Sequence, residues 1–154
     1  MSADVASAPA IVPAGVLRRF GAALYDSLLL LALVMVVTAL LLFLTGGKAV
    51  TVNDYGVWGY AYRVLLVLLV IGFFGVFWTL KGQTLGMLAW RLRVERESGS
   101  LLSWSDALKR LAAGCLSWGV LALGILWILV DRDRLAWHDR VTHTRVVVLP
   151  KKRR

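Results

Sequence analysis

Asp26 is the first residue whose type raises a chemical question, because it is a carboxylate set in a long apolar run. The stretch RRFGAALYDSLLLLALVMVV, residues 18–37, otherwise has the features of a membrane-spanning helix. A charged Asp at the centre of a span costs about 2.5–3.5 kcal/mol, so acids in membranes usually face a partner or a water-filled cavity. Arg19 precedes Asp26 by seven residues, nearly two helical turns, which puts both on one face about 10.5 Å apart. A third group reaching between them would complete a charged network.

Two main explanations of Asp26 follow from this pairing. In the first, Asp26 lies only a turn inside the membrane interface and forms a structural ion pair with Arg19. In the second, Asp26 takes part in translocation or in ligand binding, because acids within membranes often mark functional sites. A role in folding or assembly is a further alternative. The residues alone leave the choice open.

Composition defines the elements that must position these side chains. The chain has 154 residues, of which 59% are hydrophobic and 18% are charged, which indicates a small membrane protein of one domain. Three stretches carry no charge: Ser27–Gly47, Val64–Leu80 and Leu111–Val130. Each is close to the roughly 20 residues that a spanning helix needs. We expect an all-α membrane protein with two transmembrane helices and a third hydrophobic segment, which is either a span or a re-entrant hairpin bending near Gly119.

The basic residues predict the orientation of the chain in the membrane. There are 18 Lys and Arg residues against 9 Asp and Glu, concentrated in residues 81–110 and 131–154. Cytoplasmic loops carry the excess of Lys and Arg, so we expect a cytoplasmic N-terminus and an external loop at residues 45–63. A plain third span would move the basic C-terminal segment outside, so we expect the third segment to return and the C-terminus to be cytoplasmic. The basic stretches suit anionic lipid headgroups, and aromatic residues at the helix ends argue against nucleic-acid binding.

The segment between the second and third apolar runs has a different character. The sequence GQTLGMLAWRLRV, residues 82–94, predicts a short interfacial helix capped by Thr84, with Met87, Leu88 and Trp90 facing the bilayer. Its motif residues are Gly82, Gln83, Thr84 and Gly86, and the glycine spacing favours close approach of two backbones. Alternation over residues 91–94, followed by the turn residues 97–100, predicts a small β-hairpin.

A further helix is predicted to begin at Ser103 or Ser105. Either serine can cap its first turn, and Asp106 is favourable there. Residues 1–13 and 150–154 are expected to be flexible tails on a membrane domain of residues 14–149. The organisation is therefore one domain with two short tails.

The sequence lacks the parts of a recognisable catalytic or metal site. GQTLGM does not end in the Lys-Ser/Thr pair of a phosphate-binding loop, and no serine lies in a recognisable triad motif. His138, Asp139 and His143 come from one short stretch, too little for a metal site, and both histidines are expected at the cytoplasmic surface. We expect no enzymatic activity, no cofactor and no metal.

Several motifs, in order, resemble the RDD family of small bacterial membrane proteins. They are Arg19, AALYD at 22–26, KGQTLGM at 81–87, RLRV at 91–94 and WHDRVTHTRVVV at 137–148. The resemblance runs from about Ala14 to Leu149, and it implies that Arg19, Asp26 and Asp139 are the three defining residues of the family. We expect these three residues to form one charged network. One departure is His143, which stands before Thr144 where the family usually has a small residue, typically glycine.

The resemblance also implies a location and a set of functions. It places the chain in the bacterial cytoplasmic (inner) membrane, with a role in transport of ligands that are mostly unknown, and some members are linked to sodium/proton exchange. A transporter of a monovalent cation or small solute with so few spans would need a path between subunits, hence a homo-oligomer. The alternative is a structural or assembly factor that binds a partner protein or anionic lipid.

Overall fold

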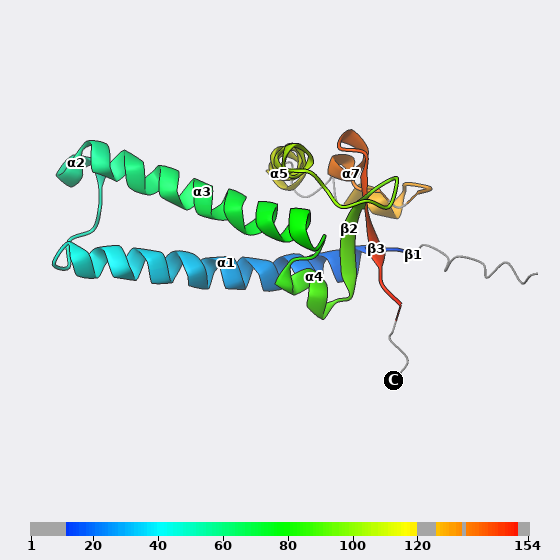
Figure 1. Cartoon of the computed structure of the whole chain (residues 1–154), viewed down its shortest axis with the longest axis horizontal. Coiled ribbons are helices and arrows are strands. Elements are labelled where there is room, and N and C mark those ends of the chain that lie inside the picture. The colour runs from blue at the N-terminus through cyan, green and yellow to red at the C-terminus, as the bar shows by residue number, and fades with distance from the viewer. Residues whose placement is uncertain (1–11, 120–125, 134, 151–154) are drawn as a thin grey trace, which may run out of the picture.

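Two long helices form a hairpin, and the short elements gather at one end of it (Figure 1). The computed structural model describes residues 12–119, 126–133 and 135–150. Helix α1 covers Val16–Leu44 and α3 covers Val57–Leu80, with the short α2, Val52–Tyr55, at the far end. Both long helices are apolar and long enough to cross a membrane. The two predicted membrane-spanning helices are therefore present.

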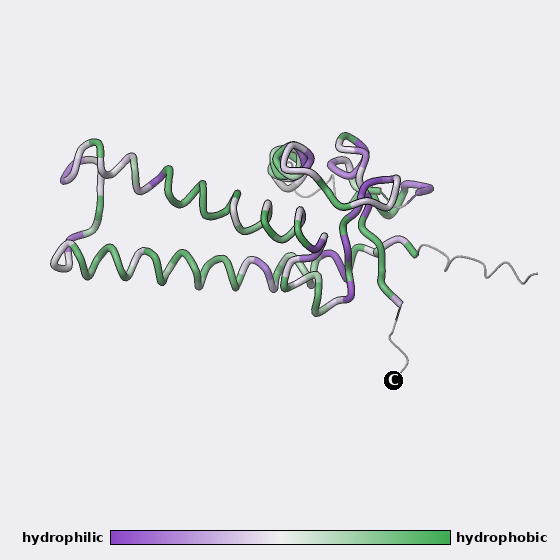
Figure 2. Tube along the Cα trace, in the orientation of Figure 1, coloured by the Kyte–Doolittle hydropathy of each residue, from purple (hydrophilic) through white to green (hydrophobic). Residues whose placement is uncertain are grey.

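The length of α1 places Asp26 near one edge of the membrane. The helix has 29 residues, and the 18 residues from 27 to 44 rise about 27 Å, close to the thickness of a bilayer core. Figure 2 shows α1 as almost continuously hydrophobic toward α2 and more hydrophilic nearer the short elements. The first part of α1 therefore lies beside the short elements, and Asp26 lies where they begin.

The short elements form a cap of helices and strands (Figure 1). Strands β2 and β3 supply much of its core, in which Leu92, Val94 and Val146 pack with Ala14 and Ala22. In chain order the cap contains β1 (Val12–Pro13), α4 (Leu85–Ala89), β2 (Leu92–Arg96), α5 (Trp104–Gly119), the 3₁₀ helix η1 (Trp127–Leu129), α7 (Trp137–Val141) and β3 (Thr144–Val148).

A three-stranded antiparallel sheet joins distant parts of the chain, with the strand order β1-β3-β2. The all-α prediction is therefore wrong in this cap, although most of the chain is helical. The predicted hairpin of residues 91–100 is also not confirmed. Strand β2 forms, but its partner is β3, with Arg96 opposite Thr144. The turn after β2 leads into α5 and not into a second strand of a hairpin. The strand that pairs with β2 is therefore β3, about 50 residues further along the chain.

The first described residues also belong to the sheet. Val12 and Pro13, assigned by the sequence to a flexible tail, form β1 and lie opposite Val148 and Val147. The next residue, Ala14, is fully buried and its N–H donates to the carbonyl of Val146 at 2.9 Å. The other tail residues, 1–11 and 151–154, lie outside the described residues.

The short helix α4 packs against α1. As predicted, Thr84 caps it, because the Thr84 hydroxyl accepts a hydrogen bond from the N–H of Met87 at 3.1 Å. The prediction for Met87 is wrong, since this side chain is buried in the cap core. Leu88 and Trp90 are exposed, as expected of side chains that face lipid.

Helix α5 runs across the hairpin and not along it. Figure 1 shows α5 nearly end-on, whereas α1 and α3 are seen from the side. Ser103 caps it, and the Asp106 carboxylate accepts from the Ser103 N–H at 2.9 Å. The third span is not confirmed, because α5 covers only the first part of the third apolar run and residues 120–125 lie outside the described residues. The exposed residues of α5 include three large apolar ones, Trp104, Leu108 and Leu116. Its buried residues include Ala107 and the polar Arg110 and Ser117.

Candidate functional site

Asp139 lies at the centre of a cluster of charged side chains in the cap. Its Oδ2 accepts hydrogen bonds from Nη1 of Arg19 and, at 3.1 Å, from the backbone N–H of Ala136. Its Oδ1 lies 2.7 Å from Nη2 of Arg110. The side chain is 0% exposed. Burial raises the pKa of Asp139, but the charges of Arg110 and Arg19 outweigh it and hold the pKa well below its usual range.

Arg110 connects this cluster to several elements. It projects from the buried face of α5, and its Nη1 donates to the hydroxyl of Thr144 on β3. Its guanidinium carbon lies 5.5 Å from the centre of the Trp78 ring on α3, a distance typical of a cation–π contact. Burial lowers the pKa of Arg110 and Asp139 opposes this effect, and the guanidinium stays charged as arginine does in proteins. One side chain thus links α3, α5, α7 and β3.

His138 is part of the same cluster, and the prediction that it lies at the surface is wrong. Its side chain is 11% exposed, with Nε2 3.6 Å from Oδ1 of Asp139. Burial, with the charge of Arg110, lowers the pKa of His138 from 6.5 to about 4, so the imidazole is neutral at neutral pH. His143, in contrast, is 82% exposed, as expected, and lies 3.6 Å from Glu97.

Asp26 is held by α4. Its Oδ2 accepts a hydrogen bond from the Thr84 hydroxyl, and its Oδ1 accepts one from the N–H of Gly86 at 2.8 Å. Gly86 permits this contact because a Cβ there would lie 2.3 Å from the carbonyl oxygen of Ala22. The Asp26 carboxylate therefore docks the start of α4 onto α1.

Gly82 and Gln83 connect α3 to β2. Gly82 has a φ of +66°, and a Cβ at this residue would lie 2.6 Å from the carbonyl oxygen of Val94. Its own carbonyl accepts from the N–H of Val94 at 2.7 Å. Nε2 of Gln83 donates to the carbonyl of Leu92 at 2.6 Å. The four motif residues therefore fix α4 and β2 to their neighbours.

The structure brings together two of the three residues proposed as a network. Arg19 pairs with Asp139, whereas the two Asp26 oxygens accept hydrogen bonds from α4. Sequence reasoning missed Arg110. A signal for it exists, because Ala107, Gly114 and Ser117 lie three, four and seven residues away and define a face of small residues on which Arg110 is the large one.

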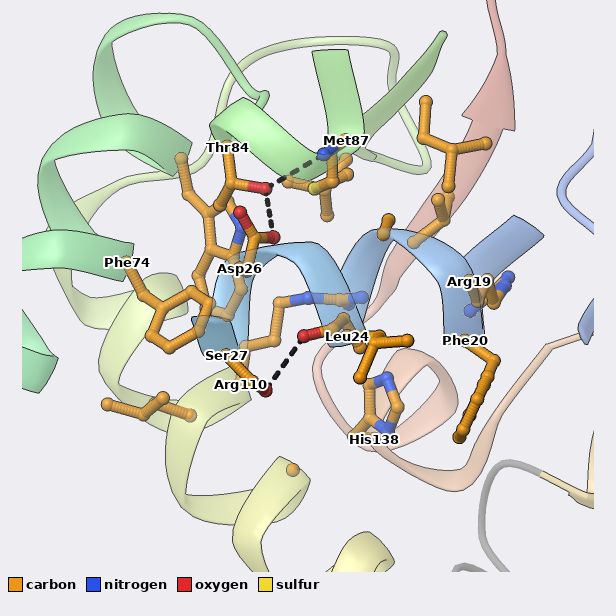
Figure 3. A pocket seen from close by; sticks show the side chains of 18 of the residues that line it. Arg19, Phe20, Leu24, Asp26, Ser27, Phe74, Thr84, Met87, Arg110 and His138 are labelled. Atoms are coloured by element: carbon orange, nitrogen blue, oxygen red, sulfur yellow. Dashed lines mark hydrogen bonds between the residues drawn. The ribbon is translucent and has the colours of Figure 1, made fainter. Parts of the chain in front are cut away.

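A cavity of about 570 Å³ lies between α1, α3 and α5 (Figure 3). Asp26, Arg19, Arg110 and His138 contribute to its wall, and most of the remaining lining is apolar. A mostly apolar cavity of this size with a few polar groups is the usual form of a small-molecule site. The cavity reaches the surface beside Phe20 and Leu24, each 53% exposed.

Together these features describe a small membrane protein whose helical hairpin ends in a cap, and buried ion pairs of Asp139 with Arg19 and Arg110 connect the elements of this cap. Residues 13–143 match the profile of the RDD family, most of the chain. The chain belongs to the RDD family. No curated protein and no solved structure matches it.

Proposed function

We propose that the chain is a multi-pass protein of the bacterial cytoplasmic membrane with its cap on the cytoplasmic side. The hairpin geometry supports this, because β1 and β3 lie at the same end and the α1–α3 connection lies at the other (Figure 1). The cap includes most of the basic stretch 81–110, whereas the connection, residues 45–56, contains Lys48 as its one basic residue. Cytoplasmic segments carry the excess of Lys and Arg.

We infer that the protein takes part in transport of an ion or small solute, with the cavity as the binding site. The observation that carries this proposal is the cavity itself, where Asp26 and two arginines reach an apolar space beside the membrane-spanning helices. Polar groups that converge on such a space indicate ligand binding in preference to an enzymatic reaction, for which the sequence offers no motif.

A homo-oligomer is part of this proposal. The two spanning helices contribute few buried residues within one chain, and their apolar side chains face outward along most of their length. A hydrated path needs walls on all sides, because unsatisfied polar groups in hydrocarbon cost several kcal/mol each. A second copy of the hairpin supplies the missing walls.

Flux into liposomes tests the transport proposal. Purified wild-type protein is reconstituted, and sodium, proton and small-solute fluxes are compared with those of empty liposomes. Gly114 lines the cavity and a Cβ there meets nothing within 4 Å, so Gly114→Leu fills space without a backbone clash. Gly72→Leu is the matched control, a helical glycine of α3 with equally open surroundings.

We expect Gly114→Leu to reduce the flux several-fold and Gly72→Leu to leave it unchanged. Wild-type flux equal to that of empty liposomes would contradict a transport function. Equal flux in wild type and Gly114→Leu would remove the cavity from the path.

A structural or assembly role is the second candidate. It is favoured because both carboxylates are already engaged within the chain, Asp139 by two arginines and Asp26 by α4. Under this alternative, substitution of Asp26 lowers the stability of the protein and liposomes show no flux at all. The same reconstitution therefore separates the two candidates.

A further inference from the structure

The cavity wall carries both apolar and polar side chains. Phe20 and Leu24 of α1 and Val70 and Phe74 of α3 are apolar lining residues. Arg19, Arg110 and His138 are polar ones, and we call the part of the wall near Arg110 its polar region. A mostly apolar cavity with cationic side chains on its wall suits an amphiphile, which has an apolar chain and a charged headgroup.

Two guanidinium groups on the wall offer donors to an anion at the polar region. Among the described residues that line the cavity, two are arginines, His138 is neutral at neutral pH, and Asp26 is the acid. Both oxygens of Asp26 accept hydrogen bonds from α4, and Asp139, which pairs with the arginines, is fully buried behind them. A ligand that enters the cavity therefore meets guanidinium groups before it meets Asp139.

An unpartnered donor points to the same conclusion. Within the part of the chain that the structure describes, the buried indole N–H of Trp78 has no hydrogen-bond acceptor. Trp78 lines the cavity and its ring lies beside the Arg110 guanidinium. Buried N–H groups are nearly always paired, because leaving one unpaired is costly. A ligand oxygen near Arg110 would supply this acceptor.

We propose that the cavity binds one anionic phospholipid from the cytoplasmic leaflet, with an acyl chain between α1 and α3 and its phosphate near Arg110 and the Trp78 N–H. This inference rests on the proposed ligand-binding role of the cavity and names the chemical class of the ligand. Phe20 and Leu24 line the cavity and are each 53% exposed, so we expect the ligand to enter beside them.

Native mass spectrometry of delipidated protein tests the proposal directly. The protein is mixed with phosphatidylglycerol or with phosphatidylcholine, which share acyl chains and differ in headgroup charge. We expect wild type to retain one phosphatidylglycerol several-fold more than phosphatidylcholine. Gly114→Leu should lose this preference, and Gly72→Leu should keep it. Equal retention of both lipids by wild type, or unchanged retention by Gly114→Leu, would overturn the proposal.

Cys115 provides a second measurement that needs no cavity variant. It is the sole cysteine, it is exposed, and it lines the cavity. Phosphatidylglycerol should slow its reaction with a maleimide, whereas phosphatidylcholine should not. The control is Ser105→Cys in a Cys115→Ser background, because Ser105 is exposed on the same helix outside the cavity lining. Equal slowing at both positions would contradict a specific site.

Free glycerol phosphate separates a lipid site from a site for a soluble anion. Slowing of Cys115 modification by glycerol phosphate alone would overturn the lipid assignment. Lipid retention without flux in liposomes would support this inference and contradict the transport proposal. Flux in liposomes without a preference for phosphatidylglycerol would contradict this inference and support the transport proposal.

Discussion

Asp139 is the residue on which the charged cluster depends. Its carboxylate is shared by Arg19 and Arg110 in a fully buried position, where desolvation of three charges opposes their attraction. Such an arrangement contributes little net stability when intact, yet removal of one member leaves the others buried without compensation. The cluster therefore specifies how α1, α5 and α7 fit together more than it adds stability.

Asp139→Asn tests whether loss of one member costs more stability than the intact cluster contributes. The substitution keeps the shape of the side chain and leaves two guanidinium groups around a neutral amide, so we expect a loss of about 3–5 kcal/mol. Thermal unfolding in detergent, followed by circular dichroism, measures it. The control is Asp133→Asn, which removes an acid that is 68% exposed and lies 3.3 Å from Arg140, and should change little. Similar melting temperatures for the two variants would contradict a buried, essential carboxylate.

His138 predicts how stability depends on pH. Because the folded-state pKa of His138 is about 4 and its ordinary value is 6.5, the unfolded chain takes up a proton between these values while the folded chain does not. Stability should be fully present above pH 6.5 and fall as the pH approaches 4, by up to about 3 kcal/mol.

His138→Gln should flatten this slope, since glutamine does not titrate. Melting temperatures at a series of pH values between 4 and 8 give the measurement. His143→Gln serves as the control and should retain the wild-type slope, because His143 is exposed and outside the cluster. An unchanged slope in His138→Gln would assign the pH dependence to another group.

His143 carries backbone strain, and it stands at the position where the family usually has glycine. Its φ is +50°, a left-handed conformation that glycine adopts freely and that costs an L-residue roughly 1–2 kcal/mol. His143→Gly should therefore raise stability by about 0.5–1 kcal/mol, after the greater flexibility of glycine in the unfolded chain is counted. Chemical denaturation measures the gain. A loss of stability would show that the contact with Glu97 matters more than the strain.

At the scale of elements, the contact between α1 and α4 depends on Gly86. A Cβ at Gly86 would overlap the carbonyl oxygen of Ala22 and the Asp26 carboxylate, at 2.3 and 2.8 Å. Gly86→Ala should therefore separate the two helices and cost about 1–3 kcal/mol. Gly72→Ala, with nothing within 4 Å, should instead stabilise its helix by about 0.5–1 kcal/mol. The difference in melting temperature between these two variants is the measurement, and an equal effect would contradict the close contact.

Local features of the elements could be predicted from the sequence, and distant contacts could not. The sequence indicates Thr84 as a cap, and Ser103 as one of two candidate caps, because a capping residue acts on N–H groups two or three residues away. The pairing of β2 with β3 was missed because the alternation of apolar and polar residues indicates a strand but not the strand with which it pairs. Arg110 was missed for a similar reason, since its counter-ion lies in another helix.

At the scale of the whole molecule, the hairpin predicts that the cap and the α1–α3 connection lie on opposite sides of the membrane. Asn53 lies in α2, and Ser98 lies in the turn that follows β2 in the cap. Both residues are exposed. In a Cys115→Ser background, Asn53→Cys should react with an impermeant maleimide on intact cells, and Ser98→Cys should react only after lysis. Reaction of Ser98→Cys on intact cells would reverse the orientation.

The apolar run lengths predict the two long helices, and charge counting predicts that the chain returns to the end of the hairpin where it begins. The cap could not be predicted in this way, because its sheet and core combine β1, β2, β3 and α4, which are far apart in the sequence. Its residues are mixed in polarity, and local periodicity carries little information about which of them meet. The resemblance located Asp139 near Arg19, which periodicity alone would not do.

The distance in sequence between Arg19 and Asp139 has a consequence for synthesis. These paired residues are 120 positions apart, so a ribosome makes Arg19 and Arg110 well before their shared counter-ion. The two spanning helices must enter the bilayer as an independent hairpin, and the cap closes only after the last strand has emerged. Until Asp139 has emerged, Arg19 and Arg110 therefore lack the shared carboxylate that compensates them in the complete cap.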